Sequence, residues 1–217
     1  MDLTLYMHPL SSYCQKVLIY FYENDTPFKV HLLDLMNEAV RREFNAMWPI
    51  GKMPLLRDGV RGRDVVESSI ILEYLEMHYP GKTRLLPADP EQRLEARRWD
   101  RIYDLYLHLP MQKIVTDNFR PEGKSDLFGV EQAKETARTV YQMIDREMAG
   151  KTWALGKDFS IADCSAAPAL FYSNMQLPLD DYPNAAAYLQ RLKERPSYAR
   201  ALREAEPYFK LIPGAKA

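Results

Sequence analysis

Hydrophobic and polar positions in the first part of the chain switch between the two-residue period of strands and the longer period of helices. Residues 3–7 alternate as a strand requires, and residues 28–33 form a second strand-like run. Apolar positions recur at helical spacing after Ser11 and Ser12, and helical polarity returns over residues 38–47. The chain is therefore predicted to begin strand, helix, strand, helix.

A hairpin and a third helix are expected next. Residues 54–57 and 63–66 are short strand candidates joined through Asp58-Gly59, and residues 67–79 have the pattern of a helix. Because a strand–helix–strand crossover is parallel and a hairpin is antiparallel, this order predicts a four-stranded mixed sheet. Such an arrangement is thioredoxin-like.

A segment rich in proline and glycine interrupts the pattern. Residues 80–90 contain three prolines and one glycine, a composition that suits a connection between domains. We therefore expect a thioredoxin-like domain at residues 1–80, a linker at residues 81–90 and an all-helical domain at residues 91–217.

Beyond this linker the pattern is helical throughout. Apolar residues at three- and four-residue spacing predict two long helices, at about residues 94–111 and 130–148. Shorter helices are expected between the prolines that follow, over residues 161–175, 184–193 and 198–205. The predicted fold class is α/β plus all-α, with an N-terminal βαβαββα domain and a C-terminal helical bundle.

Composition excludes several classes of partner. The 217 residues are 47% hydrophobic and 27% charged, and the net charge of -1 offers no field for nucleic acid or an anionic membrane. No run of about 18 apolar residues occurs, and the first residues lack the pattern of a secretory signal. Cys14 and Cys164 form no CxxC pair and no cluster with histidine. We expect a cytoplasmic protein without a metal site.

Candidate chemistry begins where the first helix follows the first strand. The start of a helix presents unpaired N–H groups and the positive end of the helix dipole, which favour an anion or a thiolate. Ser11 and Ser12 stand at that point, and a serine hydroxyl there can donate a hydrogen bond to a bound thiolate. The alternative is that both serines only cap the helix.

Two further segments suggest a ligand site at the same edge of the sheet. Met53-Pro54 opens a strand, and a cis bond there would offer the Met53 backbone to an extended peptide, whereas a trans bond would make it an ordinary strand start. Glu67-Ser68 stands between the last strand and its helix, where it can hold a carboxylate and an amine or merely cap the helix.

Together these segments resemble the three glutathione-site motifs of the cytosolic glutathione S-transferase family, in order and at family spacing. A fourth segment resembles the capping box of the family's helical domain, with Ser160 as N-cap and Asp163 three residues later. The four matching segments are residues 11–17, 49–55, 67–70 and 159–163.

The resemblance assigns roles to residues of this chain. Ser11 matches the catalytic serine of the theta, zeta and phi classes, and Tyr6 is expected on the opposite strand face from Met7, so a tyrosine mechanism is not expected. The implied glutathione-binding residues are Ser11, Lys52, Met53, Pro54, Glu67 and Ser68. The implied second-substrate pocket is lined by Tyr103, Tyr106, Leu107 and Met111, which can equally be core of the bundle.

The resemblance implies conjugation of the glutathione thiolate to a hydrophobic electrophile by a homodimer, a detoxification activity. Glutathione is then a co-substrate, and no metal is required. Two other functions stay open, a glutathione-dependent isomerase similar to maleylacetoacetate isomerase and a non-catalytic interaction module of the same fold. Cys14, three residues after Ser11, is either a redox thiol or, as we favour, a packing residue.

Overall fold

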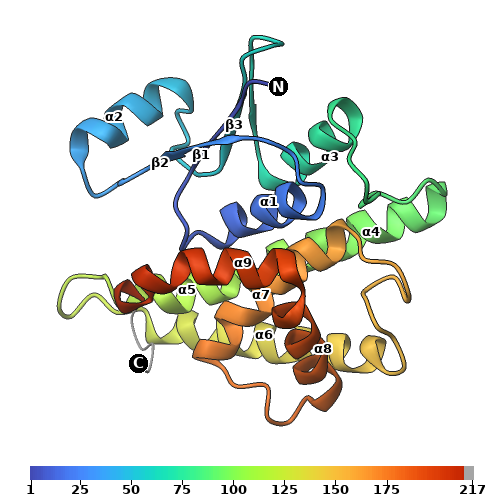
Figure 1. Cartoon of the computed structure of the whole chain (residues 1–217). Coiled ribbons are helices and arrows are strands. Elements are labelled where there is room, and N and C mark those ends of the chain that lie inside the picture. Colours follow the sequence, from blue (N-terminus) through green and yellow to red (C-terminus); the bar gives the residue numbers. More distant parts are fainter. Residues whose placement is uncertain (213–217) are drawn as a thin grey trace. The chain divides into compact units, whose positions relative to one another are not determined.

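The computed structural model describes residues 1–212 and divides the chain into two compact units, Met1–Leu85 and a second unit that begins at Leu86 (Figure 1). The first unit contains a sheet flanked by helices, and the second unit is helical within the described residues. The predicted fold class, a thioredoxin-like α/β part followed by an all-α part, is confirmed.

The first unit has the predicted order of strands and helices. Its strands form one mixed sheet in the order β2-β1-β3-β4, in which β1 is parallel to β2 and antiparallel to β3, and β4 is antiparallel to β3. The crossover and the hairpin expected from the sequence are therefore both present. The elements are β1 (Leu3–Met7), α1 (Ser12–Glu23), β2 (Lys29–Leu32), α2 (Glu38–Met47), β3 (Leu55–Asp58), β4 (Arg63–Val66) and α3 (Ser68–His78).

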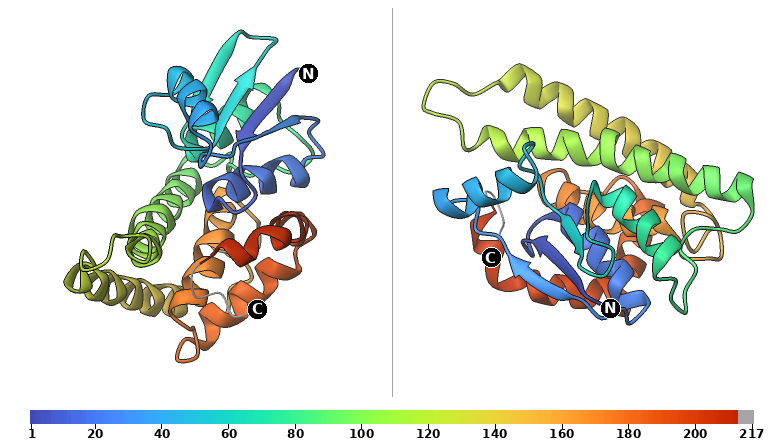
Figure 2. Two further views of the ribbon diagram at one scale, coloured as in Figure 1. Left: turned by 90° about the vertical axis from the view of Figure 1, so that its left-hand side faces the viewer. Right: turned by 90° about the horizontal axis from the view of Figure 1, so that it is seen from above.

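Alternation along β1 assigns the two faces of the sheet. Leu3, Leu5 and Met7 are buried on one face, whereas Tyr6 lies on the other and packs in the cluster that contains Phe44 of α2. Helix α2 and helix α3 lie on opposite sides of the sheet (Figure 2), and α1 packs against α3. The expectation that Tyr6 and Met7 face opposite ways is confirmed.

The second unit is a bundle of helices separated largely by the expected prolines. None of the helices in residues 1–212 combines the length and the apolar character that crossing a bilayer requires. The helices of this unit are α4 (Pro90–Ile102), a π-helical segment η1 (Tyr103–His108), α5 (Leu109–Asp117), α6 (Leu127–Met148), α7 (Ile161–Gln176), α8 (Pro183–Glu194), α9 (Pro196–Ala205) and a 3-10 segment η2 (Glu206–Leu211).

The first predicted long helix is not a continuous α-helix. A π-helical segment, Tyr103–His108, separates α4 from α5, and Pro110 follows at the start of α5. Proline has no backbone N–H, and in a continuous α-helix its ring would clash with the carbonyl four residues earlier, at Tyr106. The wider π turn before Pro110 relieves this clash.

The capping box predicted at the start of α7 is present. Ser160 is the N-cap, and its backbone N–H donates to Asp163 at 2.8 Å. The same buried carboxylate accepts from the Ala154 N–H at 2.8 Å and from the Tyr188 hydroxyl at 2.6 Å. Burial raises the pKa of Asp163, while these hydrogen bonds act in the opposite direction. One carboxylate thus ties α7 to the preceding turn and to α8.

Replacing Asp163 with alanine is expected to lower the free energy of unfolding by about 2–4 kcal/mol, because buried N–H and hydroxyl donors lose their acceptor. The matched control is Asp89→Ala, which removes the exposed N-cap of α4 that accepts from the Gln92 N–H at 2.8 Å. That loss is expected to cost only about 1 kcal/mol. Urea unfolding followed by circular dichroism compares the two variants, and equal losses would contradict the central role of Asp163.

Candidate functional site

Three turns converge on one edge of the four-stranded sheet. The pairing register places Tyr6, near the end of β1, opposite Leu55 at the start of β3, and Leu55 opposite Val66 at the end of β4. The segments after β1, before β3 and after β4 therefore leave the sheet at the same edge. These segments carry the three motifs found in the sequence, as the prediction of a shared edge requires.

Ser11 is the N-cap of α1. Its backbone is extended, with φ -72° and ψ 114°, and its Oγ accepts a hydrogen bond from the Cys14 N–H at 3.3 Å. Ser11 therefore does cap the helix, as the alternative interpretation of this segment expects. A hydroxyl group whose oxygen accepts a hydrogen bond from an N–H can still donate its own proton to another acceptor. Ser11 can therefore cap α1 and donate to an anion at the same helix end.

The turn that carries Ser11 is fixed by hydrogen bonds on both sides. The Ser11 N–H donates to the His8 carbonyl at 2.9 Å, and Nε2 of buried Gln15 donates to the Pro9 carbonyl at 2.9 Å. Burial lowers the pKa of His8, although the charge of Asp34 acts in the opposite direction, so the ring is neutral at pH 7. The Ser11 hydroxyl is thereby held in place before any ligand arrives.

The segment before β3 has an unusual backbone. The Met53–Pro54 bond is cis, so the trans alternative is wrong. Gly51 has φ +68°, and a Cβ on it would lie 2.6 Å from Oδ1 of Asn45 in α2, so this position favours glycine. Lys52 is exposed beside this turn.

The segment after β4 also departs from ordinary backbone geometry. Glu67 is an exposed non-glycine residue with φ 68° and ψ 116°, and as N-cap of α3 it makes no side-chain capping hydrogen bond. Such conformations cost free energy and occur mainly where the surrounding structure enforces them, often at functional sites. Ser68, the first residue of α3, is buried.

Comparisons with known proteins identify the family. Residues 5–83 match the model of the glutathione S-transferase N-terminal domain, and residues 128–191 match that of the glutathione S-transferase C-terminal domain. The chain belongs to the glutathione S-transferase family. The first match contains all three turns of the sheet edge, and the second contains the capping box of α7.

Relatives of this glutathione S-transferase-family chain match it along nearly its whole length. It is 28% identical over 206 residues to glutathione S-transferase GstB of Escherichia coli K12, covering 92% of this chain and 97% of the relative. It is 27% identical over 207 residues to a probable maleylacetoacetate isomerase of Caenorhabditis elegans, covering 94% of each. A crystal structure of a Methylobacterium radiotolerans glutathione S-transferase in complex with glutathione sulfonate superposes with a TM-score of 0.81 at 26% identity, covering 100% of this chain and 97% of that one.

A buried carboxylate holds the β3–β4 hairpin at the end of the sheet opposite to these three turns. Asp58, at the end of β3, is fully buried, and its Oδ2 accepts from the hydroxyls of Tyr74 at 2.7 Å and Tyr79 at 2.6 Å. Its Oδ1 accepts from the backbone N–H groups of Val60 and Arg61, both at 3.0 Å. The β3–β4 hairpin is thus bonded to α3 and to the residue that follows it.

These contacts decide the ionisation of Asp58. Burial alone would raise its pKa, but the hydrogen bonds from Tyr79, Tyr74 and the Arg61 N–H, together with the Arg61 charge, hold the pKa below its ordinary value. Burial and the same carboxylate raise the pKa of Tyr74 to about 12. Asp58 is therefore ionised and both tyrosines are protonated donors at neutral pH.

Cys14 has the environment of a packing residue. Its side chain is fully buried, and burial raises the pKa of the thiol to about 12, against the smaller lowering effects of hydrogen bonds with the Ser11 side chain and the His8 backbone. The pKa thus moves in the opposite direction from the one that a redox thiol at a helix start requires. The structure favours packing as the role of Cys14.

Most residues expected in the second-substrate pocket are buried. Tyr103, Leu107 and Met111 are 1%, 0% and 6% exposed, whereas Tyr106 is 53% exposed. The Tyr103 ring lies 5.6 Å from that of Trp99 in the same unit, and burial raises the pKa of Tyr103. This burial favours the core alternative for three residues and leaves Tyr106 as the accessible candidate of the four.

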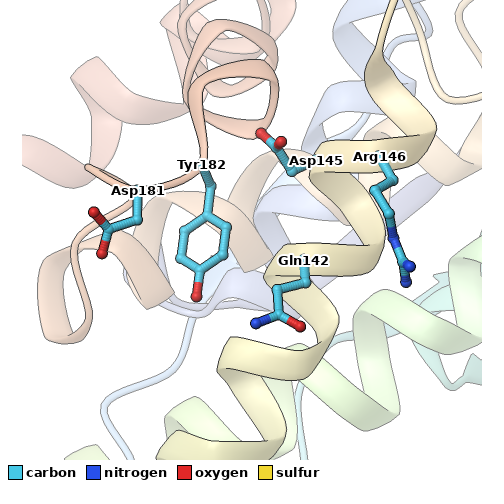
Figure 3. Close-up of a pocket in the computed structure, with 5 residues that line it drawn as sticks. All are labelled: Gln142, Asp145, Arg146, Asp181 and Tyr182. Atoms are coloured by element: carbon cyan, nitrogen blue, oxygen red, sulfur yellow. The ribbon is translucent and has the colours of Figure 1, made fainter.

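Two hollows among the described helices of the second unit are lined by other residues. One of them, of about 500 Å³, lies between α6 and the turn before α8. Figure 3 shows its lining residues, Gln142, Asp145, Arg146, Asp181 and Tyr182. Asp145 there accepts from the N–H groups of Asn184 at 2.7 Å and Ala185 at 3.0 Å, so its carboxylate caps α8. A second hollow, of about 390 Å³, is lined by residues of α7, α8 and the turn between them. Neither is lined by a residue predicted for the site.

Sequence reasoning missed two supporting residues. Asp58 was expected only as part of a hairpin turn, and no role was expected for Lys16, which lies within the first motif, yet both are buried. The Asp58-Gly59 pair and a lysine amid an apolar helix were the available signals. Across residues 1–212, no group of three or more histidine, cysteine, aspartate or glutamate side chains has the arrangement of a metal site.

Replacing Asp58 with asparagine is expected to lower the free energy of unfolding by about 1–3 kcal/mol at pH 7. The carboxylate has a depressed pKa, so its extra stabilisation is present above the unfolded pKa of about 3.9 and is lost as pH falls through the lower folded value. The difference between the wild type and Asp58→Asn should therefore shrink below about pH 4.

Asp64→Asn is the matched control for this titration, because Asp64 on β4 is exposed and pairs with Arg57 at 2.7 Å. An ion pair of this kind contributes about 0–1 kcal/mol. Urea unfolding at a series of pH values measures both variants. A gap between the wild type and Asp58→Asn that stayed constant from pH 7 to about pH 3 would contradict the depressed pKa.

The folded protein is expected to react slowly with a thiol reagent. Both cysteines are buried, and a thiol with a pKa of about 12 is ionised in only about one part in 10⁵ at pH 7. Two thiols should become reactive only after unfolding in urea. A Cys164→Ala variant assigns the signal, and one rapidly reacting equivalent in that folded variant would contradict the packing role of Cys14.

Proposed function

We propose that this chain is a glutathione transferase that binds glutathione along the sheet edge where the three turns converge and joins its sulfur to a hydrophobic electrophile. The observation that carries the proposal is the pairing register, which brings Ser11, Met53-Pro54 and Glu67-Ser68 to one edge. Membership of the glutathione S-transferase family and the glutathione sulfonate complex of a relative support glutathione as the co-substrate.

Each turn is proposed to hold a different part of the tripeptide. The γ-glutamyl carboxylate accepts from the first N–H groups of α3 and from Ser68, and Glu67 pairs with the γ-glutamyl amine. The Met53 backbone pairs with the cysteinyl residue in the manner of an added strand, with Pro54 fixing the turn. Exposed Lys52 pairs with the glycyl carboxylate.

The chemistry is proposed to begin with loss of the thiol proton to solvent. The positive end of α1 and the Ser11 hydroxyl both stabilise the thiolate, which lowers the pKa of a thiol that is ordinarily about 8.5. The thiolate then attacks the electrophilic carbon, an S–C bond forms, and the leaving group departs with its electron pair. Holding both reactants together adds the contribution of proximity.

The remaining proposals rest on the family resemblance. The electrophile is proposed to be hydrophobic and the activity to serve detoxification. Of the residues proposed for its pocket, Tyr106 is accessible, whereas Tyr103, Leu107 and Met111 are buried. The protein is proposed to work as a homodimer in the cytoplasm. A second candidate function, glutathione-dependent isomerisation, is favoured by the 27% identity to a probable maleylacetoacetate isomerase.

Ser11→Ala is expected to lower kcat/KM for conjugation of glutathione to an aryl halide by about 10²-fold, because the thiolate loses its hydroxyl donor. Glutathione should still raise the melting temperature of the variant, since the other contacts remain. The measurements are initial rates and thermal melts with and without millimolar glutathione.

Ser11→Thr is the matched control, because it keeps both the hydroxyl and the N-cap and should retain most of the activity. Cys14→Ala should also remain active. A wild type whose melting temperature is unchanged by glutathione would indicate an interaction module instead. Full activity in Ser11→Ala would contradict the proposed role of the serine.

A further inference from the structure

A lysine is buried beside the proposed γ-glutamyl subsite. Lys16 of α1 is 1% exposed, and its Nζ donates to Oγ of Ser69 at 2.8 Å. Ser69 is the second residue of α3, next to Ser68. Lysine is almost never fully buried unless a charge or a hydrogen bond compensates for the loss of water. The ammonium group of Lys16 therefore lies inside the protein, at the start of α3.

Packing alone does not account for a lysine at this position. Residues 14–21 of α1 are all buried, and most of them are apolar. An apolar side chain would fill the space at Lys16 without the cost of removing an ammonium group from water. Lys16 also does not extend its charged end to solvent, because the whole side chain is buried.

The surroundings of the ammonium group favour an anion. The N-terminus of α3 carries the positive end of the helix dipole, its first turn contains no acidic residue, and Glu67 makes no side-chain capping bond there. A positive charge beside a positive helix end is unfavourable by itself. Glu73 lies one turn beyond Ser69 in the same helix. A carboxylate bound at the helix start would interact favourably with both the dipole and Lys16.

We propose that Lys16 is a positioning residue for the γ-glutamyl carboxylate of glutathione, because its buried ammonium group holds the Ser69 hydroxyl and adds positive charge at the start of α3. This inference rests on the proposed function, since it assigns the same subsite. Lys16 acts on the carboxylate through its positive charge and through the Ser69 hydroxyl, to which its Nζ donates. Lys16 therefore contributes to the binding of a charged carboxylate and takes no part in the reaction at the sulfur.

The test compares two ligands, glutathione and an analogue in which the γ-glutamyl α-carboxylate is replaced by its carboxamide. Calorimetry gives Kd for both ligands with the wild type, Lys16→Met, Lys16→Arg and Ser69→Ala. Lys16→Met should weaken glutathione by about tenfold and the carboxamide by less than about twofold, since only the carboxylate interacts with the lost charge. Lys16→Arg keeps the charge and should restore most of the preference.

Lys82→Met is the control, because Lys82 is an exposed lysine of the same unit that pairs with Asp25. It should change neither Kd. Equal weakening of both ligands in Lys16→Met would show a packing role and overturn the inference while leaving the proposed function intact. If Lys16→Met does not fold, Lys16→Arg and Ser69→Ala decide: the inference requires Ser69→Ala to lose affinity for glutathione more than for the carboxamide. A wild type that binds neither ligand would overturn both proposals.

Discussion

The pairing of β1 with β3, and of β3 with β4, is the constraint on which the rest of the first unit depends. Leu55 pairs with Tyr6 on one side and with Val66 on the other, and this register brings three chain turns to one edge of the sheet. A slip by one residue would exchange the two faces of a strand. Met7 would then leave the core and Tyr6 would enter it. The hydrophobic pattern of β1 therefore fixes the site together with the core.

Three features of the first unit are ones that ordinary folding avoids; two of them lie at the start of α3, whereas Asp58 lies at the other end of β3, opposite Leu3. A buried carboxylate, a buried lysine and a non-glycine residue at positive φ lie in the hairpin, in α1 and before α3. Each is individually unfavourable, and the two buried charges are compensated by hydrogen bonds, from the tyrosine hydroxyls to Asp58 and from Lys16 to the Ser69 hydroxyl. Departures from local rules that are balanced in this way are typical of functional sites.

Local signals made much of this structure predictable. The alternation of β1, the helix at residues 38–47 and the capping box of Asp163 depend on neighbours in the sequence, and all three are present as predicted. The contacts of Asp58 were not predictable, because its tyrosine partners are 16 and 21 residues away. Neither was the burial of Lys16, which depends on how helices pack. The π turn required knowing how the bundle accommodates Pro110.

A crystal structure of the protein with glutathione tests the central claim most directly. The account predicts an extended tripeptide along the edge where β1, β3 and β4 end, with its sulfur beside the Ser11 hydroxyl and its γ-glutamyl carboxylate at the start of α3. Glutathione bound with its sulfur remote from Ser11, or an empty edge at saturating glutathione, would contradict it.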